Sequence, residues 1–418
     1  MNERRVVITG LGAATPFGIG IGPFWDALTE GKSAVAPIKA FDPSTLPSRI
    51  ASEVPEFKAA DFVPKGYRKN VKLMSRDIQL AVAAAYEAAK DAKLPTPCLA
   101  DRGESTTGTL DPRRFGVNIG AGLICPDLAE LAAAFATALD DKQTFDLKRW
   151  GAGGMENLGP LWLLKYLPNM LACHVTIVHD AQSFSNTITC GEASGHLAVG
   201  EAFRNIARGA MDVCICGGVE SKLNPMSVAR QSLMNRLVTD GDHEPSRACR
   251  PFAANRGGTV VSEGGGLLVL ESLDHARARG VRIYAELVGF AAAGSIQNVA
   301  EPDADGAGLS LAIRNGLRDA GVGPDRVNLI GTFGCGTQAH DASEWQAWKR
   351  TMGHAVERVP ALAIKGGLGC NGAGSGAMDL CAVVLSLYHN TVPASLNTQP
   401  GDGDCRLRFV QGDPVDAR

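Results

Sequence analysis

The sequence predicts an α/β fold in which helices alternate with mostly parallel strands. Patterns of a buried strand that ends in glycine recur along the chain, first in RRVVITGLG (4–12) and again in MDVCICGG (211–218). Helical patterns lie between these strands, and the second half repeats the same plan. Glycine is frequent, at 49 residues, whereas aromatic residues make up 6% of the chain. This composition favours tight turns and close packing of helices on sheets.

In the first half of the chain, each element follows from a local pattern. After the first strand, FWDALTEGKS (24–33) reads as a short helix that closes at a glycine. Ser75 is expected to cap a long helix that runs from Arg76 to about Ala92. The segment 95–114 is rich in Pro, Thr, Gly and Asp, which predicts an exposed loop. FGVNIGAGL (115–123) then reads as a second buried strand.

The remaining elements follow in the same way. A helical region is expected around 158–173, and a strand at 211–218 places Cys214 and Cys216 on one face. Further strands are expected at 264–272, 283–293 and 327–334, and further helices at 273–280, 306–321, 341–353 and 381–390.

Composition and charge exclude several classes of protein. The formal net charge of −3 argues against a broad nucleic-acid footprint. The 11 cysteines show no CxxC pair, so we expect neither a disulfide scaffold nor a metal site, and most of them should be small buried residues. The N-terminus lacks the apolar core of a signal peptide, and no stretch reaches ~18 uninterrupted apolar residues, which predicts a cytoplasmic protein without a membrane span. GLGAATPFG does not match the dinucleotide-binding spacing, so no cofactor is expected.

The stretch TITCGEASGHLAVGEA (187–202) is the strongest candidate for a functional site. Its second part predicts a helix, because Val199, Phe203 and Ile206 fall on one face. The N-terminus of that helix would lie near Glu192, where unpaired backbone N–H groups and the helix dipole favour negative charge. This environment activates a cysteine, and it also suits a carboxylate.

Several long segments of the sequence resemble the β-ketoacyl synthases, the condensing enzymes of fatty acid and polyketide synthesis. They are RRVVITGLGAATPFG, FWDALTEGKSAV, DPRRFGVNIGAG, SGHLAVGEAFRNIARGAMDVCICGGVES, CRPFAANRGGTVVSEGGGLLVLESLDHARARG, FGCGTQAHDASE and IKGGLGCNGAG. The resemblance implies a thiolase-type fold with two pseudo-symmetric halves, 1–270 and 271–418, whose stacked five-stranded mixed sheets have helices between and outside. It also implies a dimer that takes acyl chains from acyl carrier protein. The family's final Phe-Gly-Phe-Gly-Gly loop and last strand are not found in this sequence.

The resemblance also locates three catalytic positions, and all three are substituted. The family's nucleophilic cysteine stands two residues before a Ser-Gly pair, here Ser194-Gly195, so its position is Glu192. The first catalytic histidine opens a His-Gly-Thr-Gly-Thr motif and corresponds to Phe333. The second stands five residues after a lysine, here Lys365, and corresponds to Cys370.

These substitutions predict loss of ordinary condensation. A glutamate accepts acyl groups poorly, Phe333 cannot donate a hydrogen bond, and Cys370 is a weak donor. Loss of a single oxyanion donor typically costs ~2.7–4 kcal/mol of transition-state stabilisation. Within the family, this pattern resembles the chain-length factors, which lack the nucleophile and pair with an active synthase. Lys365 and Glu344 match positions that organise the pocket, and we expect Lys365 to approach Glu192 or Glu344.

Other interpretations of the sequence remain open. An enzyme could use Glu192 as an acid or base, or a thiol of Cys190, Cys335 or Cys370, for hydrolysis or an unusual condensation. A homodimeric acyl-binding protein without a synthase partner is a third possibility. Cys190 itself is expected to be a buried thiol on a strand, and His340 a solvated loop histidine. A small basic cluster, Arg68, Lys69 and Lys72, could contact an acidic carrier protein.

Overall fold

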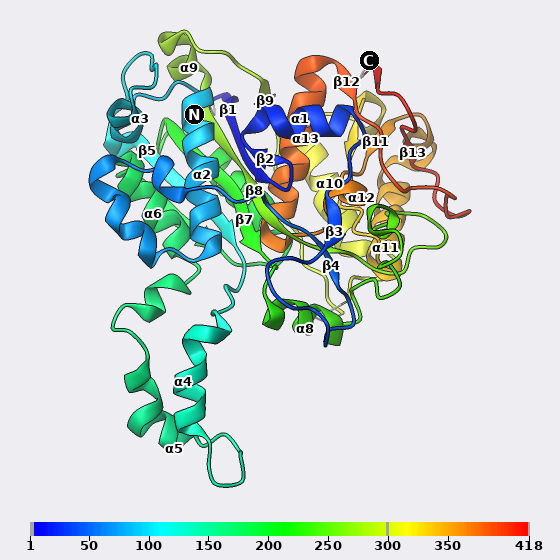
Figure 1. The fold of residues 1–418 in the computed structure, drawn as a ribbon. Coiled ribbons are helices and arrows are strands. Elements are labelled where there is room, and N and C mark those ends of the chain that lie inside the picture. The colour runs from blue at the N-terminus through cyan, green and yellow to red at the C-terminus, as the bar shows by residue number, and fades with distance from the viewer. Residues whose placement is uncertain (1–3, 298–300, 417–418) are drawn as a thin grey trace.

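A computed structural model describes residues 4–297 and 301–416 of the chain (Figure 1). The strands are β1 (Val6–Thr15), β2 (Gly18–Ile19), β3 (Val35–Pro37), β4 (Ile50–Ser52), β5 (Phe115–Ala121), β6 (Ser185–Ile188), β7 (Val213–Ser221), β8 (Val261–Ser272), β9 (Ala285–Leu287), β10 (Ile330–Gly331), β11 (Pro360–Leu362), β12 (Thr391–Val392), β13 (Arg408–Phe409) and β14 (Val415–Asp416). The α-helices are α1 (Ile21–Thr29), α2 (Arg76–Asp91), α3 (Pro97–Arg102), α4 (Leu128–Ala138), α5 (Leu147–Arg149), α6 (Met170–His179), α7 (Ser194–Ala207), α8 (Pro225–Leu233), α9 (Leu273–Arg279), α10 (Ala307–Ala320), α11 (Gln338–Met352), α12 (Lys365–Leu368) and α13 (Ser375–His389).

The central sheet is mixed and has the strand order β2-β1-β8-β7-β5-β6. β5 runs parallel to β6 and β7, whereas β8 runs antiparallel to β1 and β7. The carboxyl ends of β5, β6 and β7 therefore meet at one edge of the sheet, and the segment that leads into α7 begins there.

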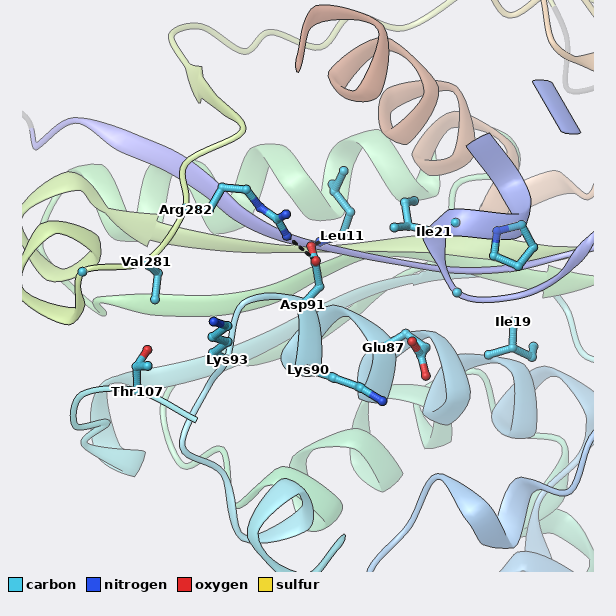
Figure 2. A pocket seen from close by; sticks show the side chains of 14 residues that line it. Leu11, Ile19, Ile21, Glu87, Lys90, Asp91, Lys93, Thr107, Val281 and Arg282 are labelled. Carbon is cyan, nitrogen blue, oxygen red and sulfur yellow. Dashed lines mark hydrogen bonds and ion pairs between the residues drawn. The ribbon is translucent and has the colours of Figure 1, made fainter. Parts of the chain in front are cut away.

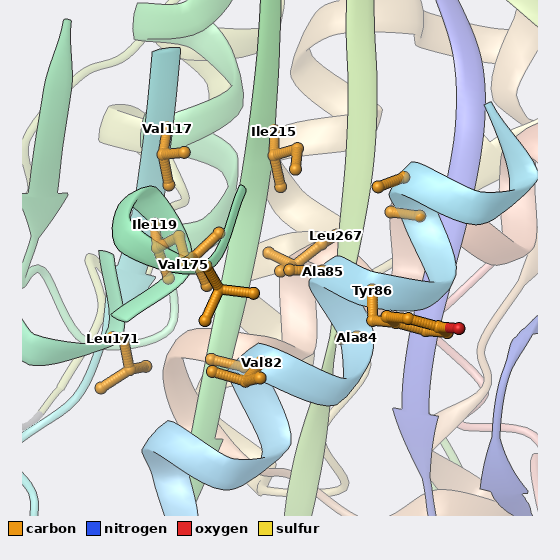
Figure 3. Packing of buried hydrophobic residues seen from close by; sticks show 14 of the residues in the cluster. Val82, Ala84, Ala85, Tyr86, Val117, Ile119, Leu171, Val175, Ile215 and Leu267 are labelled. Carbon is orange, nitrogen blue, oxygen red and sulfur yellow. The ribbon is translucent and has the colours of Figure 1, made fainter. Parts of the chain in front are cut away.

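Helices cover both faces of this sheet. On β7 and β8, Ile215 and Leu267 face the helices α2 and α6 (Figure 3). Their neighbours Cys216 and Leu268 belong to the opposite core with α7 and α13. Because successive side chains of a strand point to opposite faces, these buried strands contribute apolar side chains to two cores. The buried strands and layers confirm the expected α/β fold, and they place Cys214 and Cys216 inside as predicted.

The long helix α2 begins and ends close to where its sequence pattern predicts. The Ser75 hydroxyl accepts a hydrogen bond from the Ile78 amide and caps the helix. β1 meets this helix at very short range, because a Cβ atom on Gly12 would lie 2.1 Å from the Ala84 carbonyl oxygen. Glycine at this point therefore allows backbone to pack directly on backbone.

The second half of the chain carries a smaller sheet than the sequence suggests. Its parallel strands β10, β11 and β13 form a three-stranded sheet, and β9 pairs with β1 of the central sheet instead. The expected strands at 283–293 and 327–334 shorten to three and two residues, respectively. The second half therefore has a three-stranded sheet where the resemblance implies a five-stranded one. The residues that flank the short strands pair with no neighbouring strand among those described.

Two segments differ from their predicted form. The segment 95–114 is not a plain exposed loop, because it contains α3, whose Cys98 and Leu99 are buried in the core. The region expected to be helical from 158 begins its α-helix only at Met170. Between β5 and α6 the chain instead extends as an arm that includes α4 and α5 and projects from the body (Figure 1).

Candidate functional site

The turn before α7 presents Glu192 at the edge of the central sheet. Ser194 fixes this turn, because its hydroxyl accepts a hydrogen bond from the Cys190 amide and donates one to the Gly191 carbonyl, each at 2.7 Å. Gly191 has a φ of 54°, a conformation that favours glycine. A Cβ atom on Gly195 would lie 2.8 Å from the Ala373 carbonyl oxygen, so α7 begins in close contact with the segment before α13.

Glu192 belongs to a row of alternating charges. Its Oε1 atom lies 2.8 Å from Nη2 of Arg236, and its side chain is 26% exposed. Behind it, Lys222 pairs with Glu220 at 2.7 Å, and Glu220 also accepts a hydrogen bond from the Ala373 amide. Burial alone would raise the pKa of Glu192, but the charges of Arg236 and Lys222 outweigh it and hold the pKa below its usual value. Glu192 is therefore a fixed anion at the position that the sequence predicts for the family's nucleophile.

Lys365 does not contact either carboxylate that the sequence suggested. Its Nζ atom lies 2.5 Å from Asp379 on α13, so the expected pairing with Glu192 or Glu344 is not formed, although the charge of Lys365 still lowers the pKa of Glu344. Both members of this pair are buried, and burial raises the pKa of Asp379 to about 6 although Lys365 opposes that change. The Phe333 ring covers the ammonium group at 4.8 Å from its centroid. Lys365 therefore pairs with α13 and not with the turn that carries Glu192.

Two buried carboxylates of α11 hold the loop that carries Phe333. Glu344 accepts hydrogen bonds from the amides of Phe333 and Gly334 at 2.8 and 2.9 Å. Asp341 accepts one from the Cys335 amide at 3.0 Å, and burial raises its pKa to about 7. The loop is thus anchored through its backbone, and this anchoring does not depend on which side chain stands at position 333.

The thiols near the site have different environments. Cys370 is 3% exposed, and its Sγ atom lies 3.5 Å from the hydroxyl of Ser375. Cys335 is fully buried, and burial raises the pKa of its thiol well above the usual value. Cys190, which was expected to be buried on a strand, is instead exposed in the turn after β6. Cys190 is not buried because β6 ends at Ile188, before Cys190 is reached. Among the described residues, no group of His, Cys, Asp and Glu is arranged to hold a metal ion.

A cavity of about 310 Å³ is lined in part by Arg236, the partner of Glu192. Its walls are Met234, Asn235, Arg236, Gly257, Gly258, Glu301, Thr337, Gln338, Ala339 and His340. Arg236 was not predicted from the sequence as the partner of Glu192, and His340 was expected to be a solvated loop residue. His340 instead lies in the first turn of α11 and is half-buried. A histidine three residues after a capping threonine was the available signal for this placement.

A second cavity lies apart from these residues, between β1, the C-terminal part of α2 and the segment before β9. It measures about 530 Å³, and Figure 2 shows its lining. Asp91 closes one wall, where it pairs with Arg282 and accepts hydrogen bonds from the Tyr284 hydroxyl and the Leu11 amide. These contacts satisfy the hydrogen-bonding capacity of the carboxylate, so we interpret this cavity as a gap between packed elements and not as a ligand site.

Replacing Arg236 with methionine is expected to raise the pKa of Glu192. Burial, which raises this pKa, would remain, whereas the strongest of the charges that lower it would be lost. Titration of the Glu192 carboxyl carbon by NMR measures the change. The variant Arg250→Met serves as the control, because Arg250 lies near Asp240 and is not a partner of Glu192. An unchanged Glu192 titration in Arg236→Met would contradict the assigned ion pair.

Comparison with known proteins identifies relatives over nearly the whole chain. The N-terminal domain of beta-ketoacyl synthase matches residues 3–276, and its C-terminal domain matches residues 284–399. A 3-oxoacyl-[acyl-carrier-protein] synthase 2 from Synechocystis is 33% identical over 412 residues, which cover 99% of this chain and 92% of that protein. A putative polyketide beta-ketoacyl synthase 1 from Streptomyces halstedii is 33% identical and covers 100% of this chain and 92% of that protein.

Solved structures show the same architecture. The ishigamide ketosynthase/chain length factor superposes with a TM-score of 0.82 at 28% identity, covering 99% of this chain and 93% of that one. A beta-ketoacyl synthase from Burkholderia phymatum superposes with a TM-score of 0.83 at 28% identity, with the same coverage. The fold is therefore of the thiolase type, with a mixed sheet and helices on both faces. With both domains matched and the fold shared, the chain belongs to the beta-ketoacyl synthase family.

Proposed function

We propose that this chain is a non-condensing subunit of acyl-carrier-protein-dependent fatty acid or polyketide synthesis in the cytoplasm. Like a chain length factor, it would pair with an active synthase and help to select the length of the acyl chain. The observation that carries this proposal is the fixed Glu192–Arg236 ion pair at the nucleophile position. A carboxylate held by a guanidinium is a poor acceptor for an acyl group, and an acyl anhydride formed there would hydrolyse.

The two other substituted positions support the same conclusion. Phe333 offers a ring that covers Lys365, and Cys370 is buried beside the hydroxyl of Ser375. Neither side chain replaces a histidine that would stabilise an oxyanion during decarboxylation of a malonyl group. The fold around them is intact, since Glu344 still anchors the Phe333 loop. The chain would therefore keep the shape of the site without its condensing chemistry.

The outer edge of the central sheet supports pairing with a second ketosynthase-fold chain. β6 is the last strand of the sheet, and the exposed apolar side chains of Ile177 and Phe184 lie beside it. An edge strand with apolar neighbours is a template for another strand. This surface lies within Asn169–Ser194, the segment that we propose forms the dimer interface. The partner would be an active synthase in the proposed role, or a second copy if the protein instead acts as a homodimeric acyl-binding protein.

The surface also offers a place for acyl carrier protein. Lys65, Arg68, Lys69 and Lys72 are exposed on one short helical segment, 65–73. None of the four forms an ion pair with another described residue. An acidic carrier protein would be attracted to this cluster. In keeping with such a role, one structural neighbour is a polyketide acyl-carrier protein in complex with its ketosynthase. Among the described residues, no helix has the length and apolar character needed to cross a membrane.

Incubation with acyl and malonyl carrier protein is expected to leave the protein without a covalent acyl group. Intact-mass spectrometry checks this, and carbon dioxide release checks decarboxylation. The matched variant Glu192→Cys restores a thiol at the helix terminus and is expected to gain an acyl adduct. An adduct on the wild-type chain, or carbon dioxide release that Glu192→Ala abolishes, would overturn the non-condensing assignment in favour of an enzyme that uses Glu192 or a nearby cysteine.

A further inference from the structure

His340 lies next to the position where the family's first catalytic histidine is lost. The centroid of its ring is 6.3 Å from that of Phe333, the residue that replaces the histidine. His340 comes from the first turn of α11, and the Phe333 loop leads directly into that helix. The loop is held by Asp341 and Glu344 of the same helix, so the two rings keep a fixed relation. An imidazole is therefore present beside Phe333, although it comes from a residue seven positions further along the chain.

Hydrogen bonds around Thr337 are compatible with a tautomer of His340 in which Nε2 is free. The Thr337 hydroxyl oxygen accepts the His340 amide at 3.3 Å and lies 2.9 Å from Nδ1 of the same residue. It also lies 3.4 Å from the Sγ atom of Cys335, which can accept the hydroxyl proton. With that proton directed to the sulfur, the oxygen accepts Nδ1–H, and Nε2 is left as an unprotonated acceptor.

The charges around His340 favour its neutral form. Burial lowers the pKa of His340, and the charge of Arg236 lowers it further, whereas the carboxylates of Glu192 and Glu301 oppose this shift. The net pKa is below the usual histidine value, so the imidazole is unprotonated at neutral pH. A neutral, half-buried imidazole facing a cavity is a suitable acceptor for a proton from water.

The same cavity contains groups that could stabilise a developing negative charge. Gln338 and Ala339 begin the 15-residue helix α11 and line the cavity, where the helix dipole and first-turn amides favour an anion. Arg236 is 8% exposed and also lines the cavity, and its Nε atom has no hydrogen-bond acceptor among the described residues. This buried donor is an independent indication that a polar ligand enters here.

We propose that His340 acts as a general base for the hydrolysis of an acyl thioester in this cavity. The oxygen of a water molecule attacks the thioester carbonyl carbon while Nε2 of His340 takes a proton from that water. The amides of Gln338 and Ala339, together with Arg236, stabilise the tetrahedral oxyanion. The C–S bond then breaks, the thiolate takes the proton from the imidazolium, and a carboxylic acid and a free thiol leave.

This inference rests on the proposed function only for the source of the thioester, an acyl chain on carrier protein. It assigns the chain a role in releasing acyl groups, in addition to selecting them. A chain that cannot form a carbon–carbon bond at Glu192 can still perform this hydrolysis, because no acyl-enzyme is required. The two proposals therefore fail independently. Loss of an effect on chain length would leave the hydrolysis intact, and the reverse is also true.

Hydrolysis of the hexanoyl thioester of N-acetylcysteamine by the full chain tests the assignment, with hexanoic acid measured by chromatography. The variant His340→Gln is expected to lower kcat/KM by about 10²-fold or more, the usual contribution of a general base. Added imidazole is expected to restore part of the activity of His340→Ala. The exposed His354 provides the control, and His354→Gln is expected to behave like the wild type.

The pH profile and a second variant separate His340 from the neighbouring carboxylate. The wild-type rate is expected to fall as the pH decreases through the lowered pKa of His340, and His340→Gln to lose that inflection. Glu192→Gln removes a carboxylate that raises the pKa of His340, so its inflection is expected to move to lower pH and not to disappear. A wild-type rate no faster than that of His340→Gln overturns the proposal, as does a rate that depends on Glu192 and not on His340. Circular dichroism serves as the control that each variant is folded.

Discussion

Replacing Lys365 with methionine is expected to lower the free energy of unfolding by about 3–5 kcal/mol. Lys365 is 2% exposed, and its ammonium group pairs with Asp379, which is itself 8% exposed. Removing one member of a buried pair leaves the other charge without compensation, and the Phe333 ring that covers Lys365 cannot supply it. Urea denaturation followed by circular dichroism measures the loss.

The pH dependence of this variant has a definite sign. Burial already raises the pKa of Asp379 to about 6 with Lys365 present, and loss of the cation is expected to raise it further. A carboxyl group whose pKa is higher in the folded state favours folding at low pH, and this contribution is lost as the pH rises from the unfolded value of about 3.9 toward the folded pKa. The loss of unfolding free energy in Lys365→Met, relative to wild type, should therefore be smaller at pH 5 than at pH 8.

Two further variants make this result specific. Lys349 is exposed on α11, so Lys349→Met is expected to leave the unfolding free energy nearly unchanged. The double variant Lys365→Met/Asp379→Leu removes both charges and is expected to recover part of the lost stability. If Lys365→Met were as stable as Lys349→Met at both pH values, the buried pair would not have the role assigned to it.

The variant Gly120→Ala is expected to destabilise the protein by about 3 kcal/mol and to displace the turn that carries Glu192. A Cβ atom on Gly120 in β5 would lie 2.4 Å from the carbonyl carbon of Ser194 and 2.5 Å from the Gly195 nitrogen. These are backbone atoms in a fully packed region, so the overlap can be relieved only by moving α7 away from the sheet. Chemical denaturation measures the stability, and the Glu192 carboxyl resonance reports the displacement.

Gly66→Ala is the matched control for that change. A Cβ atom on Gly66 would have no neighbour within 4 Å, so its effect is expected to be within about 0.5 kcal/mol of zero. The two alanines add the same methyl group and differ only in the space available. Equal stability of the two variants, with an unmoved Glu192 resonance, would contradict the close approach of β5 and α7.

Local patterns in the sequence were sufficient for the elements that depend on short-range physics. The helix capped by Ser75 and the buried strand with Cys214 and Cys216 lie where their patterns predict. Such elements are encoded by spacing, because a helical face and a capping hydroxyl involve residues at most a few positions apart. The strands around Ala285 and Ile330 were overestimated, since an apolar run does not reveal whether a neighbouring strand will pair with it.

By itself, the sequence determined that the fold is an α/β layer structure, and it predicts that Glu192, Phe333 and Cys370 stand at the family's catalytic positions. Only the tertiary structure decided how the charges pair. Arg236 is 44 residues from Glu192 along the chain, and Asp379 binds the lysine that the sequence had assigned to Glu192 or Glu344. Ion pairs of this kind depend on which elements the fold brings together and on how deeply each charge is buried. Neither can be predicted from the spacing of residues within a short segment. For the same reason His340 became a candidate base only once α11 had placed it beside Phe333.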